Sequence, residues 1–172
     1  MARAEGSRQN GVADRISREQ RRWLMSRVRS KDTKPEMRVR SYLHQRGYRY
    51  RLHVEGMPGK PDIVLPRYRT VIFVNGCFWH RHEGCRRAST PKTNTAFWER
   101  KFRANVSRDE RTQISLQCEG WTVLVVWECQ TVGSQSLADT LGVVLPTRIP
   151  AKDITTPRLD ALQHSSDRDA IR

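Results

Sequence analysis

The sequence has no long apolar run. No stretch approaches the length that a membrane-spanning helix requires, and the N-terminus lacks the apolar core of a signal peptide. We therefore expect a soluble, cytoplasmic protein. Acidic residues are also scarce, because 18 Asp and Glu stand against 32 Lys and Arg, for a net charge of +14. This excess predicts a polyanionic partner, most commonly nucleic acid, with a merely arginine-rich surface as the alternative.

Cysteine is sparse, with four residues in a chain of 172. Four cysteines could form two disulfides in a secreted protein, but without an export signal a metal site is the better interpretation. Structural zinc takes four nitrogen or sulfur ligands, and Cys77, His82 and Cys85 can supply three. We expect the fourth from Cys129, which follows the end of a strand as Cys77 does. Cys118 is the competing candidate, and a set of unrelated free cysteines is the alternative to any site.

The pattern of apolar residues, caps and breakers predicts an α/β fold. Capping boxes at Ser17–Gln20 and Thr33–Glu36 open two helices, and Gly47 ends the second. Three strands, a long helix, a core strand and a last helix follow, at 48–53, 62–66, 70–74, 95–120, 121–128 and 134–144. This order predicts a mixed central sheet flanked by helices.

The two ends of the chain differ in composition from its middle. Residues 1–16 are polar and basic with little to bury, which predicts a flexible arm that either follows a phosphate backbone or stays unstructured. Beyond Pro146 the chain is again polar, and we expect residues 146–172 to be disordered. Residues 17–145 are left as a single domain.

Residues with useful chemistry gather near one pair of strand ends. If the second and third strands form an antiparallel hairpin, Asp62 lies near Val74 and Asn75. Magnesium prefers oxygen ligands, and the Asp62 carboxylate and the main-chain oxygen of Val74 could provide them. His80 is not needed for zinc, and an imidazole can transfer protons near neutral pH. An aspartate at a strand start is weak evidence alone, but with His80 and a basic groove it predicts metal-assisted phosphate chemistry.

Large aromatic residues lie close to the same loop. Phe78 and Trp79 are too large and too clustered for ordinary loop residues, so we expect them to touch a ligand. Trp98 belongs to the long helix and shares an apolar spacing of four with Phe102, which makes a core position the alternative for it. Glu36 has a sufficient structural explanation as a helix cap.

Several segments also resemble a known family, the very short patch repair endonucleases of bacteria. The resemblance covers about 22–130 and runs in order through RSKDTKPE, PGKPDIVL, VIFVNGCFWHRHEGC, TAFWERK, NVSRDER and GWTVLVVWEC. It implies a restriction-endonuclease-like fold. It also implies an enzyme that nicks DNA on the 5′ side of the thymine in a T:G mismatch left by deamination of 5-methylcytosine.

The resemblance implies roles for residues at matching positions. Asp62 matches the aspartate that binds catalytic Mg²⁺, and Val74 the residue that lends it a main-chain oxygen. His80 matches the histidine that activates or orients the attacking water, and Glu36 the glutamate that reaches the metal's water shell. Asn75 departs from the family, because it stands where the best-known members carry a second active-site histidine.

The remaining implied roles concern zinc and DNA. The matching structural zinc ligands are Cys77, His82, Cys85 and Cys129. The aromatic residues that resemble those wedged into the base stack beside the mismatch are Phe78, Trp79 and Trp98. Two further departures are Val74, which replaces a threonine, and Gly84, which lengthens the spacing between His82 and Cys85.

The sequence therefore predicts a monomeric, nucleoid-associated endonuclease that uses Mg²⁺ for catalysis and Zn²⁺ for structure. Its substrate would be double-stranded DNA with a T:G mismatch, and its products a 3′-hydroxyl and a 5′-phosphate. Two alternatives stay open at this point. One is a zinc-stabilised nucleic-acid-binding protein without catalysis, and the other is a related nuclease of different DNA specificity.

Overall fold

The computed structural model describes residues 17–27, 29, 31–142 and 145. The arm predicted at 1–16 and the tail predicted at 146–172 lie outside the described residues. The helices are α1 (Arg18–Ser26), α2 (Lys34–Gln45), α3 (Thr95–Cys118) and α4 (Ser134–Gly142), with short 3₁₀ helices η1 (Pro66–Tyr68) and η2 (Glu128–Thr131). The strands are β1 (Arg51–Leu52), β2 (Ile63–Leu65), β3 (Thr70–Asn75) and β4 (Thr122–Trp127).

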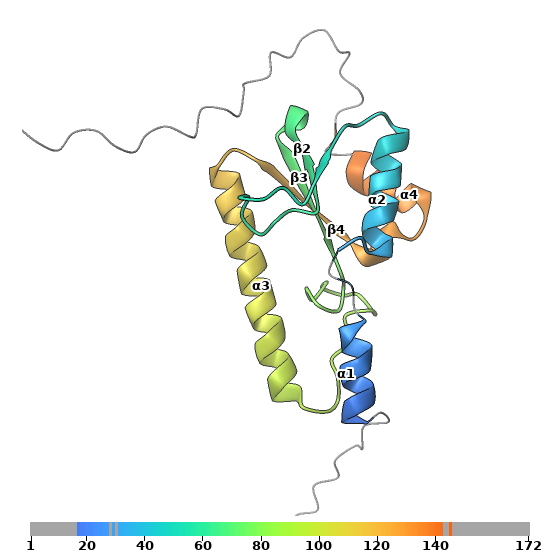
Figure 1. Cartoon of the computed structure of the whole chain (residues 1–172), viewed down its shortest axis with the longest axis vertical. Coiled ribbons are helices and arrows are strands. Elements are labelled where there is room, and N and C mark those ends of the chain that lie inside the picture. Colours follow the sequence, from blue (N-terminus) through green and yellow to red (C-terminus); the bar gives the residue numbers. More distant parts are fainter. Residues whose placement is uncertain (1–16, 28, 30, 143–144, 146–172) are drawn as a thin grey trace, which may run out of the picture.

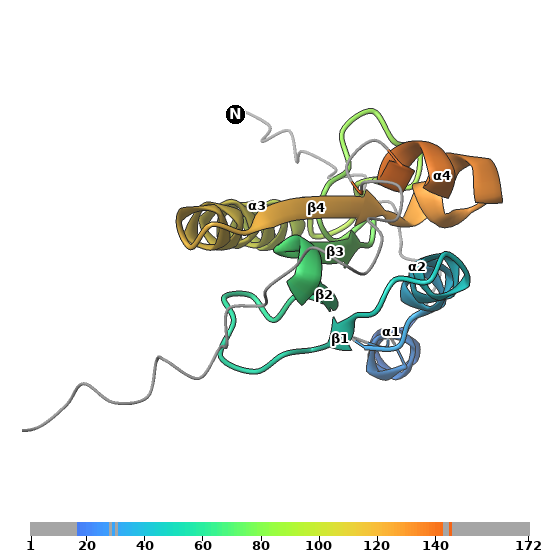
Figure 2. The same ribbon diagram turned by 90° about the horizontal axis from the view of Figure 1, so that it is seen from above.

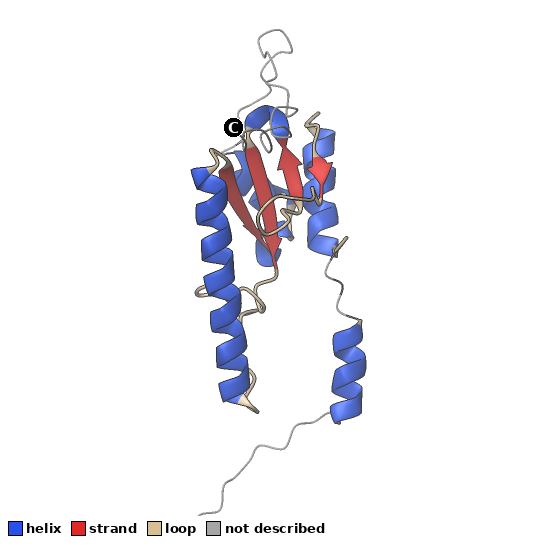
Figure 3. Ribbon diagram, turned by 60° about the vertical axis from the view of Figure 1, so that its left-hand side comes forward, coloured by secondary structure: helices blue, strands red, loops and turns tan. Residues whose placement is uncertain are grey.

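The four strands form a mixed sheet in the order β1-β2-β3-β4, which confirms the predicted α/β class (Figures 1 and 3). The β1–β2 and β2–β3 pairs are antiparallel, and β3 and β4 are parallel. The β2–β3 hairpin pairs Ile63 with Ile72, as the sequence predicts for two short strands joined by a tight turn. The predicted strand at 48–53 is wrong in extent, because only Arg51 and Leu52 pair with β2.

Helices cover both faces of the sheet, so the strands bury alternate residues on opposite sides (Figure 2). On one face, Ile72 and Val126 pack with α2 and α4, including Leu43 and Leu141. On the other face, Val71 packs against α3. The β-branched composition of β3 and β4 suits this arrangement, since such side chains pack well on a pleated surface buried from both sides.

The helix starts follow the predicted capping boxes in two cases. Ser17 with Gln20 caps α1, and Thr33 with Glu36 caps α2 with reciprocal side-chain and main-chain hydrogen bonds. The apolar face of α1 is nevertheless exposed, with Trp23 54% accessible. No helix among the described residues is long and apolar enough to cross a membrane.

Candidate active site and metal centre

A cavity of about 790 Å³ opens between the start of α2, the loop before β2, the end of β3 and α3. Its lining contains four acids and two imidazoles: Glu36, Asp62, Asp109, Glu128, His53 and His80. Lysines and arginines join them: Arg29, Lys31, Lys60, Lys101 and Arg108. A basic pocket with carboxylates at its centre can hold both a phosphate and a divalent cation.

Asp62 lies immediately before β2, next to the end of β3. Its Oδ2 accepts a hydrogen bond from the main-chain N–H of Val74 at 2.7 Å. The antiparallel register of β2 and β3 produces this contact, since it brings the start of one strand beside the end of the other. The predicted proximity of Asp62 to Val74 is therefore confirmed, although the contact uses the N–H and not the carbonyl of Val74.

The carboxyl group of Asp62 is mostly withdrawn from water. Burial raises its pKa from the usual 3.8 to about 6, although the hydrogen bond from Val74 acts in the opposite direction. The negative charge of Glu36 adds to the rise. A pair of neighbouring carboxylates in a low-dielectric pocket gains from a divalent cation, because the cation offsets both the desolvation and the mutual repulsion.

His80 is held by a residue that the sequence analysis does not single out. Its Nδ1 lies 2.5 Å from Oδ2 of Asp109, and both side chains are partly buried. Because a carboxylate only accepts, His80 donates from Nδ1 and keeps Nε2 for another partner. Asp109 comes from α3, 29 residues further along the chain, so no local motif joins the two.

A signal for Asp109 does exist in the spacing of α3. The inward stripe of this helix recurs at three and four residues through Trp98, Phe102, Asn105, Asp109 and Thr112, and the polar members face the cavity. Polar residues that continue an apolar stripe indicate a site beside the core. Ile114, further along the same helix, lies off this stripe and is 59% exposed.

The loop before Asp62 is fixed against α3 by a glycine. Gly59 has φ +66°, and a Cβ at this position would lie 2.3 Å from Cγ2 of Thr112. Any side chain would therefore push the loop away from the helix. Gly59 thus lets the chain pass close to α3 just before Asp62.

Three cysteines and one histidine converge beyond the end of β3, as the sequence predicts. The ligand atoms of Cys77, His82, Cys85 and Cys129 all lie within 4.8 Å of one another. Nδ1 of His82 is 3.2 Å from Sγ of Cys129 and 3.7 Å from Sγ of Cys77. Cys118 is exposed at the end of α3 and does not join the cluster.

The surroundings of this cluster fix its members in place. The ring of His82 stacks on Trp127, with ring centroids 4.3 Å apart and planes at 7°. Burial raises the pKa of the Cys77 thiol, whereas the main-chain N–H of Arg87 lowers that of Cys85. Three sulfurs and one imidazole nitrogen at this separation match the donor set of a tetrahedral structural metal.

The aromatic residues form one packed cluster. The ring centroid of Phe78 lies 5.0 Å from that of Trp79, 5.4 Å from that of Trp98 and 5.2 Å from that of Phe102. Trp79 lines the cavity, and its carbonyl accepts a hydrogen bond from the buried amide of Asn105. Trp98 is only 9% exposed, which is the burial expected of its alternative role as a core residue.

Comparison with known proteins gives one consistent answer. Residues 13–87 match the family described as DNA mismatch endonuclease Vsr. Type II nicking enzyme V.XorIIP of Xanthomonas oryzae pv. oryzae is 54% identical over 119 residues, which cover 69% of this chain and 87% of the relative. Type II nicking enzyme V.NmeAIP of Neisseria meningitidis serogroup A is 43% identical, over 69% of this chain and 84% of the relative.

DNA mismatch endonuclease Vsr of Escherichia coli K12 is 44% identical over 115 residues, which cover 67% of this chain and 73% of the relative. The aligned parts are thus far longer than the site loops alone, and their sequence identity is high enough to show homology along most of the domain and not only at short motifs. The chain belongs to the Vsr family of DNA mismatch endonucleases, and it is an endodeoxyribonuclease.

Proposed function

We propose that this endonuclease uses Mg²⁺ to nick DNA on the 5′ side of the thymine in a T:G mismatch, in the very short patch repair of deaminated 5-methylcytosine. It would act as a monomer on the nucleoid and leave a 3′-hydroxyl and a 5′-phosphate. One observation carries the proposal. Two pairs of residues line the same basic cavity: Asp62 with Val74, and His80 with Asp109.

The donors around Asp62 fit Mg²⁺. Among the described residues Oδ1 of Asp62 has no hydrogen-bond partner, and Glu36 is close enough for its charge to act on Asp62. We assign the metal to Asp62 and the main-chain oxygen of Val74, with Glu36 ordering the waters around it. Bound there, the ion would polarise the scissile phosphate as a Lewis acid.

His80 would assist the attacking water. Its Nδ1–H points to Asp109, so the free Nε2 can accept a proton from water as the phosphate is attacked. Asp109 fixes the tautomer and orientation of the ring and stabilises the imidazolium that forms. Asn75 also lines the cavity and offers an amide to a phosphate oxygen, but it cannot take a proton near neutral pH.

Asp109→Asn should slow nicking by about 10–100-fold, because the amide can present its NH₂ to Nδ1 and favour the wrong tautomer. Single-turnover rates on a T:G duplex with saturating enzyme measure this loss. Glu110→Gln is the matched control, since Glu110 is the exposed neighbour on α3 and should keep the wild-type rate. Equal rates for Asp109→Asn and wild type would remove Asp109 from the mechanism.

The four-ligand cluster would hold Zn²⁺ and brace the loop that carries Phe78, Trp79 and His80. Phe78 and Trp79 would wedge beside the mismatch, where bases unstack more cheaply than in paired DNA. We extend this role to Trp98 as well, which requires the aromatic cluster to open on DNA binding because Trp98 is buried in the free protein.

A nicking assay on a small panel of duplexes tests the whole proposal. With Mg²⁺, a T:G duplex should be cut in the thymine strand only, and matched T:A and C:G duplexes should stay intact. Equal cutting of matched duplexes would favour a related nuclease of different specificity, an alternative that the nicking-enzyme names of two relatives keep in view. Membership of an endonuclease family argues against the non-catalytic binding protein.

A further inference from the structure

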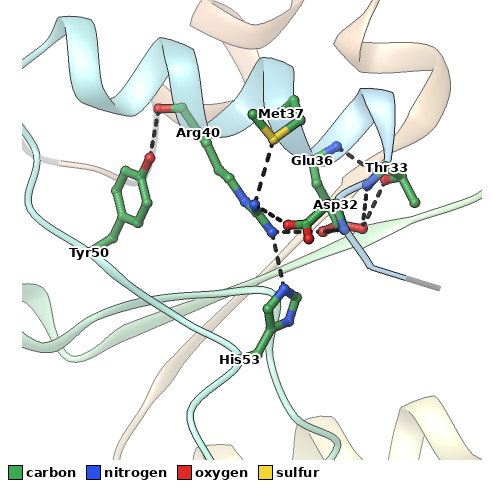
Figure 4. A network of polar contacts seen from close by, with 7 residues as sticks. All are labelled: Asp32, Thr33, Glu36, Met37, Arg40, Tyr50 and His53. Atoms are coloured by element: carbon green, nitrogen blue, oxygen red, sulfur yellow. Dashed lines mark hydrogen bonds and ion pairs between the residues drawn. The ribbon is translucent and has the colours of Figure 1, made fainter. Parts of the chain in front are cut away.

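A buried arginine lies directly behind Glu36. Arg40 follows Glu36 by one turn of α2, and its side chain is 7% exposed (Figure 4). Its Nη2 donates to Oε2 of Glu36 at 2.9 Å, and its Nη1 donates to Oδ1 of Asp32 at 2.5 Å. Nη2 also lies 3.1 Å from Nε2 of His53, which comes from the loop after β1. Arg40 therefore joins three segments, and two of its partners, Glu36 and His53, line the cavity.

The partners of Arg40 are arranged as they would be around a metal ion. Oxygen atoms of Asp32 and Glu36 and a ring nitrogen of His53 all lie within 4.8 Å of one another. The guanidinium group occupies this convergence (Figure 4). Because a guanidinium keeps its charge at any physiological pH, the protein supplies a permanent cation of its own at this point.

The carboxylate of Glu36 is held from two sides. On the helix-cap side, Oε1 accepts from the hydroxyl of Thr33 at 2.8 Å, and Oε2 accepts from the main-chain N–H of Asp32 at 3.0 Å. On the other side, Oε2 accepts from Arg40. Glu36 is only 3% exposed, so its carboxylate depends mainly on these protein partners. Without Arg40 the carboxylate would be a buried charge without a countercharge, which is strongly unfavourable.

Stability alone does not explain the ion pair. Its neighbours on the same face of α2, Val39 and Leu43, are fully buried in the apolar core. Apolar residues in place of a buried ion pair are often neutral or stabilising. In addition, Nε of Arg40 is buried without a hydrogen-bond partner among the described residues, which is itself a cost. Buried polar groups that break the packing rules in this way concentrate at functional sites.

We propose that Arg40 is a positioning residue for the nicking reaction. It holds the Glu36 carboxylate in place at the wall of the Asp62 cavity and compensates its charge. Arg40 acts through Glu36 and does not touch DNA or the metal. This inference rests on the proposed function, in which Glu36 orders the waters of the catalytic metal.

A double-mutant cycle tests the inference. Arg40→Met should slow single-turnover nicking of a T:G duplex by about tenfold or more, the usual cost of losing a partner behind a metal site, and leave the dissociation constant for DNA within about twofold. Glu36→Gln should slow nicking in the same way. The combined variant should be within about twofold of Glu36→Gln, because Arg40 has nothing left to position. Arg38→Met, exposed on the same helix, is the control and should behave as wild type.

Two outcomes overturn the inference. One is an Arg40→Met protein that nicks within about twofold of wild type, and the other is a combined variant in which the two losses multiply. If Arg40→Met does not fold, Arg40→Lys replaces it in the same cycle, since an ammonium keeps the charge but cannot reach all three partners. A wild-type protein that binds the duplex without nicking would instead refute the proposed function itself.

Discussion

Replacing Asp62 by alanine should abolish nicking while DNA binding survives. The carboxylate is a largely desolvated oxygen donor in the cavity lining, and it accepts a hydrogen bond from the main-chain N–H of Val74 at the end of β3. Losing Lewis-acid stabilisation worth several kcal/mol corresponds to a rate loss of at least about a thousandfold. Single-turnover nicking and a gel-shift titration on the same T:G duplex measure the two effects separately.

Two variants make this result specific. Asp62→Asn keeps the size of the side chain and should lose nicking to the same extent, which rules out a packing defect as the cause. Glu55→Ala removes an exposed carboxylate from the loop before Asp62 and should leave the rate unchanged. Full nicking activity in Asp62→Ala would place the catalytic metal elsewhere.

The raised pKa of Asp62 also predicts how stability depends on pH in the metal-free protein. Since burial moves this pKa from 3.8 to about 6, the folded state binds the proton more tightly than the unfolded state. The resulting stabilisation is complete below about pH 4 and is lost as the pH rises through about 6. In EDTA near pH 7.5, Asp62→Asn should therefore be more stable than wild type by roughly 3 kcal/mol, and this gain should vanish near pH 4. Urea denaturation measures the difference.

Cys129→Ser should have the second large effect, a joint loss of zinc and of thermal stability. Cys129 is the one member of the cluster that comes from beyond β4, so a zinc ion bound there would tie that end of the sheet to the loop after β3. Metal binding to a structural site contributes directly to folding free energy. We expect bound zinc to fall from about one ion per chain to near none, and the melting temperature to fall by about 10 °C, which corresponds to roughly 3 kcal/mol.

Cys118→Ser provides the matched control, because Cys118 is exposed and lies outside the cluster. Its zinc content and melting temperature should equal those of wild type. Elemental analysis of the purified proteins and thermal scans with and without a chelator give both readings. If Cys129→Ser retained its zinc, the cluster would not be the zinc site that we propose.

Local patterns in the sequence were sufficient for several features. The reciprocal caps of α1 and α2 depend on residues three positions apart, and the β2–β3 hairpin depends on two adjacent strands and a tight turn. The hairpin alone brings Asp62 to Val74, so the position of Asp62 beside the end of β3 could be predicted. The choice of Cys129 over Cys118 also followed from strand ends, because parallel neighbours such as β3 and β4 finish side by side.

Contacts across long stretches of chain could not be predicted in this way. Asp109 reaches His80 only because α3 packs beside the sheet. Arg40 meets His53 only because β1, which precedes His53, is the edge strand of the sheet. The polar stripe of α3 places Asp109 beside the cavity, but neither its sequence neighbourhood nor that of Arg40 identifies the distant residue that each side chain meets.

The sequence by itself determined the class of fold, the four-residue Cys/His cluster and the acid beside β3, because each depends on spacing within one element or between neighbouring strands. Only the tertiary structure decided which charges support them, with Asp109 behind His80 and Arg40 behind Glu36. The physical reason is the reach of the forces involved. Hydrogen bonding and capping act over a few residues, whereas the pairing of buried charges depends on where packing brings distant elements together.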